Sequence, residues 1–131
     1  MEAYDRACRE LNITQPKIEV LHAIGPNKRY GDYTSGIHRV RLFLGGITAY
    51  ERDGLRFAQS ELTRTLLHEL RHGWQAFHSR EMWEAANEGP REQDAESWAV
   101  RKVAEYRNIV RLSRSFPNSG FSRLSRHAVR R

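Results

Sequence analysis

Two histidines and a glutamate stand close together in the run His68-Glu69-Leu70-Arg71-His72. The segment that leads up to this run contains no glycine or proline, which predicts one continuous helix. Residues four apart on a helix share a face, with Cβ atoms roughly 5–6 Å apart, so His68 and His72 can bind one metal ion. Glu69 lies about 100° round the helix from His68, where it can contact a water on that metal. This HExxH pattern therefore predicts two metal ligands and a general base.

A catalytic zinc ion usually takes three protein ligands plus a water, so a third ligand is expected. The preferred candidate is Glu92, which opens a second predicted helix, and Asp94 and Glu96 are alternatives on the same helix. Glu96 shares a face with Glu92, so it can accept an N–H from a ligand histidine if Glu92 binds the metal. The simpler explanation is that all three are solvated carboxylates near a helix N-terminus, where the helix dipole favours negative charge.

His78 is the rival third ligand, because it has the histidine spacing of the pattern HExxHxxGxxH. That pattern needs a glycine to turn the chain out of the helix, and Gln75 occupies this position. If the helix continues, His78 lies on a different face from His72. The glutamate-liganded alternative is therefore favoured.

An N-terminal helix, a small sheet and two long helices are expected to position these residues, which is an α+β arrangement. Alternating apolar residues predict strands, with Val40 and Leu42 facing the core. The steps of three and four residues between Leu66, Leu70, Trp74 and Phe77 predict the buried face of the motif helix. In chain order the expected elements are a helix over 1–11, strands over 17–24, 37–44 and 47–50, a helix over 57–78, and a helix from Gly89-Pro90 to about Leu112.

The two motifs together resemble a known family. The HExxH run followed by Glu92-Gln93-Asp94-Ala95-Glu96-Ser97-Trp98-Ala99 is similar to the gluzincin pattern HExxH plus ExxAxxxA. The nearest resemblance is to the ImmA/IrrE-type metallopeptidases, whose second motif reads E-x-x-A-N-x-F-A. Here Glu96 replaces the family's asparagine or aspartate, and Trp98 its phenylalanine. The resemblance implies a minimal zincin-like domain with a small twisted, mostly antiparallel sheet above the active-site helix.

The resemblance also implies a zinc-dependent endopeptidase. His68, His72 and Glu92 would hold Zn²⁺, and Glu69 would be the general base for a water activated by the metal. A peptide or protein substrate would lie along the strand over 37–44 as an added strand. The candidates for an oxyanion donor are His38, Tyr50 and Tyr106. The alternative function is a non-catalytic or latent zinc-binding interaction or sensor domain.

The composition predicts one small globular domain over 1–112 and a basic tail over 113–131, since apolar residues make up 39% and charged residues 29% of 131 residues. From Arg111 to the end the chain has six arginines and no acidic residue, which accounts for the formal charge of +6. Such a tail is typical of a flexible, solubilising extension, and its functional alternative is attraction to nucleic acid or to an acidic partner.

The remaining features predict a cytoplasmic protein. No apolar run approaches the roughly 18–20 residues of a membrane span, and the charged start of the chain is unlike a signal peptide. The single cysteine, Cys8, excludes an internal disulfide framework and fits a reducing compartment. Cys8 is expected to be a buried residue of the N-terminal helix.

Overall fold

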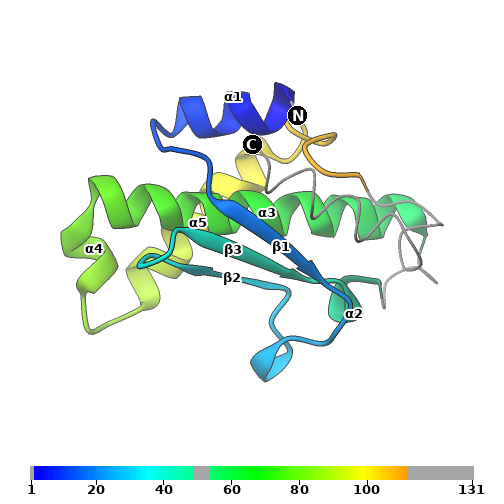
Figure 1. The fold of residues 1–131 in the computed structure, drawn as a ribbon, viewed down its shortest axis with the longest axis horizontal. Coiled ribbons are helices and arrows are strands. Elements are labelled where there is room, and N and C mark those ends of the chain that lie inside the picture. The colour runs from blue at the N-terminus through cyan, green and yellow to red at the C-terminus, as the bar shows by residue number, and fades with distance from the viewer. Residues whose placement is uncertain (1, 49–53, 112–131) are drawn as a thin grey trace.

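A long helix, α3 (Leu55–His78), crosses the middle of the protein, and the other elements pack around it (Figure 1). The computed structural model describes residues 2–48 and 54–111. A three-stranded sheet packs along one side of α3, and helix α5 (Gly89–Lys102) packs along another side. The N-terminal helix α1 (Glu2–Glu10) precedes the sheet, and the short helix α4 (Arg80–Glu84) joins the two long helices. The α+β arrangement expected from the sequence is therefore confirmed.

The sheet is mixed, and its central strand is β3 (Arg39–Phe43). Strand β1 (Lys17–Leu21) pairs with β3 in parallel, with Ile18 opposite Val40, and β2 (Gly31–Thr34) pairs with β3 antiparallel. The expectation of a mostly antiparallel sheet is wrong, since one of the two strand pairs is parallel. The expectation that the strand over 37–44 is the edge strand is also wrong, because β3 has a partner on each side.

The third strand lies elsewhere than the sequence predicted. The run that follows β3 forms the short helix α2 (Leu44–Ile47), so the prediction of a strand over 47–50 is wrong at Ile47, which is helical. Positions 49–53 lie outside the described residues. The actual third strand is β2, which follows a 3₁₀ turn, η1 (Pro26–Lys28). Its four residues, Gly-Asp-Tyr-Thr, include two that strands disfavour, so the sequence pattern did not predict it.

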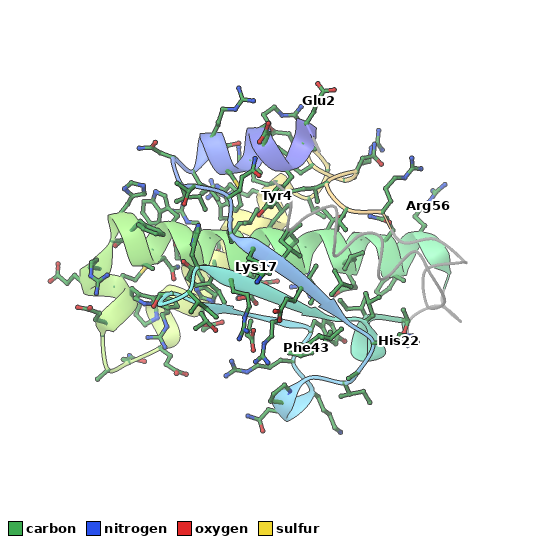
Figure 2. All side chains as sticks on the ribbon, in the orientation of Figure 1. Glu2, Tyr4, Lys17, His22, Phe43 and Arg56 are labelled. Carbon is green, nitrogen blue, oxygen red and sulfur yellow. The ribbon has the colours of Figure 1, made fainter. Side chains whose placement is uncertain are left out.

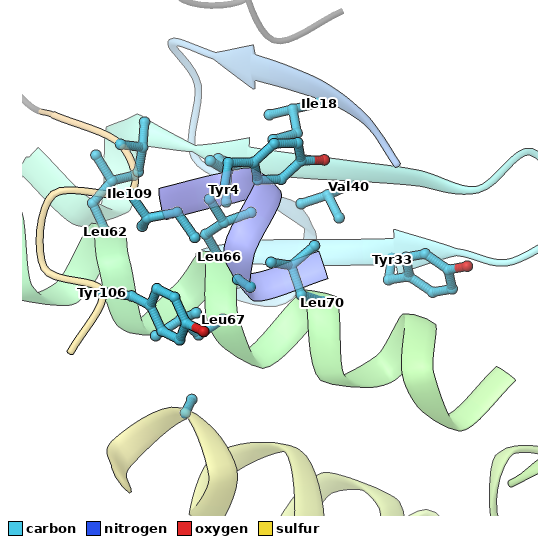
Figure 3. Packing of buried hydrophobic residues seen from close by; sticks show 14 of the residues in the cluster. Tyr4, Ile18, Tyr33, Val40, Leu62, Leu66, Leu67, Leu70, Tyr106 and Ile109 are labelled. Atoms are coloured by element: carbon cyan, nitrogen blue, oxygen red, sulfur yellow. The ribbon is translucent and has the colours of Figure 1, made fainter. Parts of the chain in front are cut away.

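The core lies between α1, the sheet and α3. Figure 2 shows Tyr4 pointing from α1 into this space, where its hydroxyl donates a hydrogen bond to the Pro16 carbonyl over 2.6 Å. Figure 3 shows leucines of α3 meeting Ile18 and Val40 from the sheet. The fully buried leucines of α3 in this core are Leu62, Leu66, Leu67 and Leu70. Cys8 is buried, as expected.

The predicted core face of α3 extends too far along the helix. Leu66 and Leu70 are buried, but Trp74 is only partly buried and Phe77 is 53% exposed. The last turns of α3 run beyond the strands of the sheet (Figure 1), and the Phe77 ring contacts His38 in the turn between β2 and β3, with centroids 5.0 Å apart. Sequence periodicity identifies the apolar face of a helix but not how much of it another element covers.

Helix α5 ends at Lys102, about ten residues before its predicted end. Turns follow, in which Tyr106, Ile109 and Val110 are buried. Gln59 of α3 anchors these turns through a hydrogen bond of 2.5 Å to the Val110 carbonyl. The predicted basic tail over 113–131 lies outside the described residues. Within the described part of the chain, no helix is both long and apolar enough to cross a membrane.

Candidate metal centre

Helices α3 and α5 bring the three preferred ligands together. His68 and His72 lie one turn apart on α3, and Glu92 lies in the first turn of α5. One ligand atom from each of the three lies within 4.8 Å of the other two. The Glu92 carboxylate spans the gap, with Oε1 3.2 Å from His68 Nε2 and Oε2 3.0 Å from His72 Nε2. Pro90 favours a helix start here and so places Glu92 at the end of α5 nearest the histidines.

The second nitrogen of each ring also faces an acceptor. His68 Nδ1 lies 3.0 Å from Glu96 Oε1, and His72 Nδ1 lies 2.8 Å from Gln75 Oε1. The orientation of the Gln75 amide follows from its other contacts, because its Nε2 donates to the Arg91 carbonyl over 2.8 Å and to Asp94 over 2.9 Å. With its proton on Nδ1, each ring would donate to its outer acceptor and direct Nε2 toward Glu92.

This pattern of acceptors is suited to a cation between the three side chains. A neutral imidazole has one N–H, and in both rings that proton is used by the acceptor at Nδ1. Nε2 of each ring would then present a lone pair to a carboxylate oxygen, unless a second proton or a metal ion lies between them. Two protonated rings would repel each other, since their centroids are only 4.8 Å apart. One divalent cation relieves both contacts and neutralises the carboxylate.

Charged side chains hold the two outer acceptors in place. Arg64 donates to both oxygens of Glu96 over 2.8 and 2.7 Å and to Glu61 over 2.5 Å. Arg71 donates to both oxygens of Asp94 over 2.8 and 3.2 Å. His68 is thus connected through Glu96 to Arg64, and His72 is connected through Gln75 and then Asp94 to Arg71. These links restrict the rotation of both rings.

The alternative third ligands are engaged elsewhere. Asp94 accepts hydrogen bonds from Arg71 and Gln75, and Glu96 faces His68 Nδ1 rather than Nε2. His78 lies at the end of α3, where its Nε2 donates to the Asn12 carbonyl over 2.7 Å. The adjacent His68 and His72 rings lower the pKa of Glu92 far below its usual value, so its carboxylate is ionised and available to a metal.

Glu69 lies beside the triad on α3 and is 6% exposed. Burial raises its pKa to about 8, while His72 opposes this rise and Glu92 adds to it. The strand β2 passes directly over it, because a Cβ built on Gly31 would lie 3.4 Å from Glu69 Cγ and 2.8 Å from Thr65 Cγ2. Gly31 is therefore required for the close approach of the edge strand to the centre.

A cavity of about 550 Å³ opens over these residues. Its floor contains His68, Glu69 and His72, and β2 forms one wall. Trp83 of α4 closes one end, where its ring lies 5.5 Å from the His72 ring and 5.8 Å from the Tyr33 ring. Strand β2 is an edge strand of the sheet, so its unpaired edge borders this cavity.

The oxyanion candidates do not line this cavity within the described residues. His38 lies in the turn between β2 and β3, where its ring contacts the Tyr33 hydroxyl and the Thr14 carbonyl, each over 2.7 Å. Tyr106 is buried and donates to Glu10 over 2.5 Å, and Tyr50 lies outside the described residues. The cavity instead contains Tyr30 and Tyr33. The sequence pattern did not select either tyrosine because it did not predict β2.

The comparisons add no family to this description: no protein-family model matches the chain, and comparison with curated proteins and with solved structures gives no match. The candidate metal centre therefore rests on the geometry of His68, His72 and Glu92.

Proposed function

We propose that the protein is a zinc-dependent endopeptidase whose metal is held by His68, His72 and Glu92. The convergence of two Nε2 atoms and one carboxylate within 4.8 Å carries this proposal. Two imidazole nitrogens and a carboxylate oxygen are a ligand set that zinc accepts, and three protein ligands leave a position for water. Zinc in such a site supplies a Lewis acid, which lowers the pKa of water and polarises a carbonyl group.

Glu69 is the general base in this proposal. Its carboxyl group is buried beside His72, and burial raises its pKa to about 8, which makes the ionised form a stronger proton acceptor. A cation at the centre would bring this pKa down, since positive charge favours the ionised carboxylate. Glu69 can then take a proton from the attacking water and return it to the amine that leaves.

The edge strand β2 supplies the surface on which a peptide would lie. The Phe43 N–H donates to the Tyr30 carbonyl over 2.7 Å, so the backbone groups of Tyr30, Asp32 and Thr34 face β3. By alternation, the backbone groups of Gly31 and Tyr33 face the open edge above the cavity. An extended peptide could add to this edge by main-chain hydrogen bonds, which would place its carbonyl groups over the centre.

The resemblance to the ImmA/IrrE-type metallopeptidases supports the same function. The residue at the position of the family's asparagine or aspartate is Glu96, whose carboxylate lies 3.0 Å from His68 Nδ1. The longer side chain therefore reaches the ring that the motif requires it to contact. A minimal zincin-like domain, with β2 as the edge strand over α3, is part of this proposal.

The test combines metal analysis with turnover of an unstructured protein such as casein. The purified chain should contain one zinc per molecule, and Glu92→Gln should lose most of it, whereas Asp94→Asn should retain it. Glu69→Gln should keep its zinc and lose hydrolysis, because the base is removed but the ligands are not. Glu81→Gln on α4, an exposed site away from the cavity, is the matched control and should behave like the wild type.

Two results would contradict the proposal in different ways. A wild-type protein that binds no zinc would remove the metal centre itself. Stoichiometric zinc without turnover of any unfolded substrate would favour the alternative function, a non-catalytic or latent zinc-binding domain. Unchanged turnover in Glu69→Gln would remove the general-base role of Glu69 alone.

A further inference from the structure

The basic side chains of the cavity fall into two kinds. Arg64 is paired with Glu61 and Glu96, and Arg91 with Glu88. The other two, Lys28 and Arg29, line the same cavity but have no ion-pair partner within the described part of the chain. Lys28 and Arg29 are thus the basic side chains of the cavity that form no ion pair in that part of the chain, and they lie together just before β2.

The backbone holds this pair in a defined position. Asn27 and Lys28 adopt left-handed conformations, with φ of 53° and 59°. Two 3.0 Å hydrogen bonds close the turn, from the Lys28 N–H to the Gly25 carbonyl and from the Arg29 N–H to the Pro26 carbonyl. Gly25 packs so tightly that a Cβ there would lie 2.5 Å from the Phe43 ring. The turn is therefore packed against the sheet at Gly25, and Lys28 and Arg29 are exposed beside it.

The alternation of side chains along an extended strand also directs Arg29 toward the centre. Arg29 precedes β2 by two positions, so it continues the face on which Gly31 meets Glu69. Arg29 and Glu69 line the same cavity.

The two ends of the cavity differ in chemistry. Beyond Gly31 lie Lys28 and Arg29, whereas the far end is walled by Tyr33 and Trp83. Arg91 lies over the Trp83 ring at that far end, but its charge is paired with Glu88. Between them the floor is rich in carboxylates, which would repel an anionic group at the centre itself. A negatively charged substrate group is consequently favoured at one end only.

We propose that Lys28 and Arg29 form a subsite for a carboxylate of the peptide substrate, one or two residues from the bond above the metal centre. This inference rests on the proposed function, in that it takes an extended peptide on β2 as the ligand. The carboxylate could belong to an acidic side chain or to a free C-terminus. Arg29 suits either, because a guanidinium binds a carboxylate through two parallel hydrogen bonds.

The experiment measures binding of fluorescent pentapeptides to the zinc-loaded full chain carrying Glu69→Gln, so that hydrolysis does not interfere. Peptides blocked at both ends carry glutamate, glutamine or lysine at each position in turn, and one further peptide has a free C-terminus. At the best position, the glutamate peptide should bind about tenfold more tightly than the glutamine peptide, the scale of one charge-assisted pair. Tighter binding of the unblocked peptide alone would identify a free C-terminus as the source of the carboxylate.

Charge reversal separates a local subsite from general attraction. Arg29→Glu, and independently Lys28→Glu, should abolish the preference for glutamate and favour the lysine peptide. Arg56→Glu changes the net charge equally at the exposed start of α3 and should leave the preference intact (Figure 2). Equal effects of Arg29→Glu and Arg56→Glu would overturn the subsite, as would peptide binding that does not depend on charge or no binding of any peptide.

Turnover of the best-binding peptide by the wild-type chain keeps the two proposals distinct. Charge-dependent binding without turnover would retain the subsite and remove the peptidase. Turnover without charge dependence would retain the peptidase and remove the subsite.

Discussion

Replacing Gln75 by leucine should weaken the metal centre without altering any of its three ligands. The Gln75 side chain is fully buried, and its amide oxygen accepts a hydrogen bond from His72 while its nitrogen donates to Asp94 and to the Arg91 carbonyl. Leucine fills a similar volume but has no polar atom. The Nδ1–H of His72 would lose its acceptor, and the ring would lose the contact that directs its Nε2 toward Glu92.

The size of the effect follows from these contacts. Loss of the partner behind a ligand histidine typically weakens metal binding 10- to 100-fold, which is about 1.4–2.7 kcal/mol. The Arg91 carbonyl and Asp94 would each lack one donor, and an unsatisfied buried group costs about 1–3 kcal/mol. Asp94 retains Arg71 and is 26% exposed, so the lower part of that range applies. The melting temperature of the metal-free protein should fall by several degrees.

The assay measures zinc affinity by competition with a fluorescent chelator. The measurement is made under conditions in which circular dichroism shows that each protein is folded. Gln93→Leu makes the same chemical change at an exposed position of α5 and should leave the affinity unchanged. Gln75→Glu restores an acceptor for His72 but places a second carboxylate beside Asp94, so it should keep more affinity and lose stability. If folded Gln75→Leu bound zinc as tightly as the wild type, Gln75 would not orient His72.

Three further changes test other parts of the structure. Gly31→Ala should destabilise the protein by about 1–3 kcal/mol, because the new Cβ would lie 2.9 Å from a backbone carbonyl oxygen. Gly36→Ala is the control, since a Cβ there would meet open space. Equal thermal melts of the two variants would show that β2 does not approach that closely. Burial raises the pKa of Glu10, but hydrogen bonds from Lys102 and a buried tyrosine outweigh it and keep the pKa below its usual 4.5. The stability that ionised Glu10 contributes is therefore present above pH 4.5 and is lost as the pH falls through the lower pKa of Glu10 in the folded protein. Urea melts should therefore show that wild type and Glu10→Gln differ in stability at pH 7 and converge at low pH. A difference that stays constant with pH would contradict this. Deleting 113–131 should reduce retention on DNA at low salt and much less at moderate salt, and unchanged retention would rule out the tail as a nucleic-acid contact.

Several features of the site could be predicted from local sequence rules alone. The spacing of His68 and His72 sets them on one face of α3, and the spacing of Glu92 and Glu96 does the same on α5. These relations depend only on the period of a helix, which is the same wherever the helix lies. That Pro90 begins α5 is a similarly local rule.

The sheet could be predicted only in part, because strand pairing is not local. Val40 and Leu42 are buried as their alternation indicates. Nothing in the run itself shows that β3 has a partner on both sides, or that four residues with a glycine and an aspartate form the edge strand. The position of β2 is decided by its packing on α3, since Gly31 is the residue that allows the approach to Thr65.

The sequence by itself determined which side chains could form a metal centre, because a helix places residues four apart on one face regardless of its surroundings. Tertiary structure alone decided that α3 and α5 lie side by side, so that the Glu92 carboxylate reaches both Nε2 atoms. It also decided that Gln75 supports His72 and that Glu69 is buried. Those properties depend on contacts between segments far apart in the chain, which only the packed core brings together.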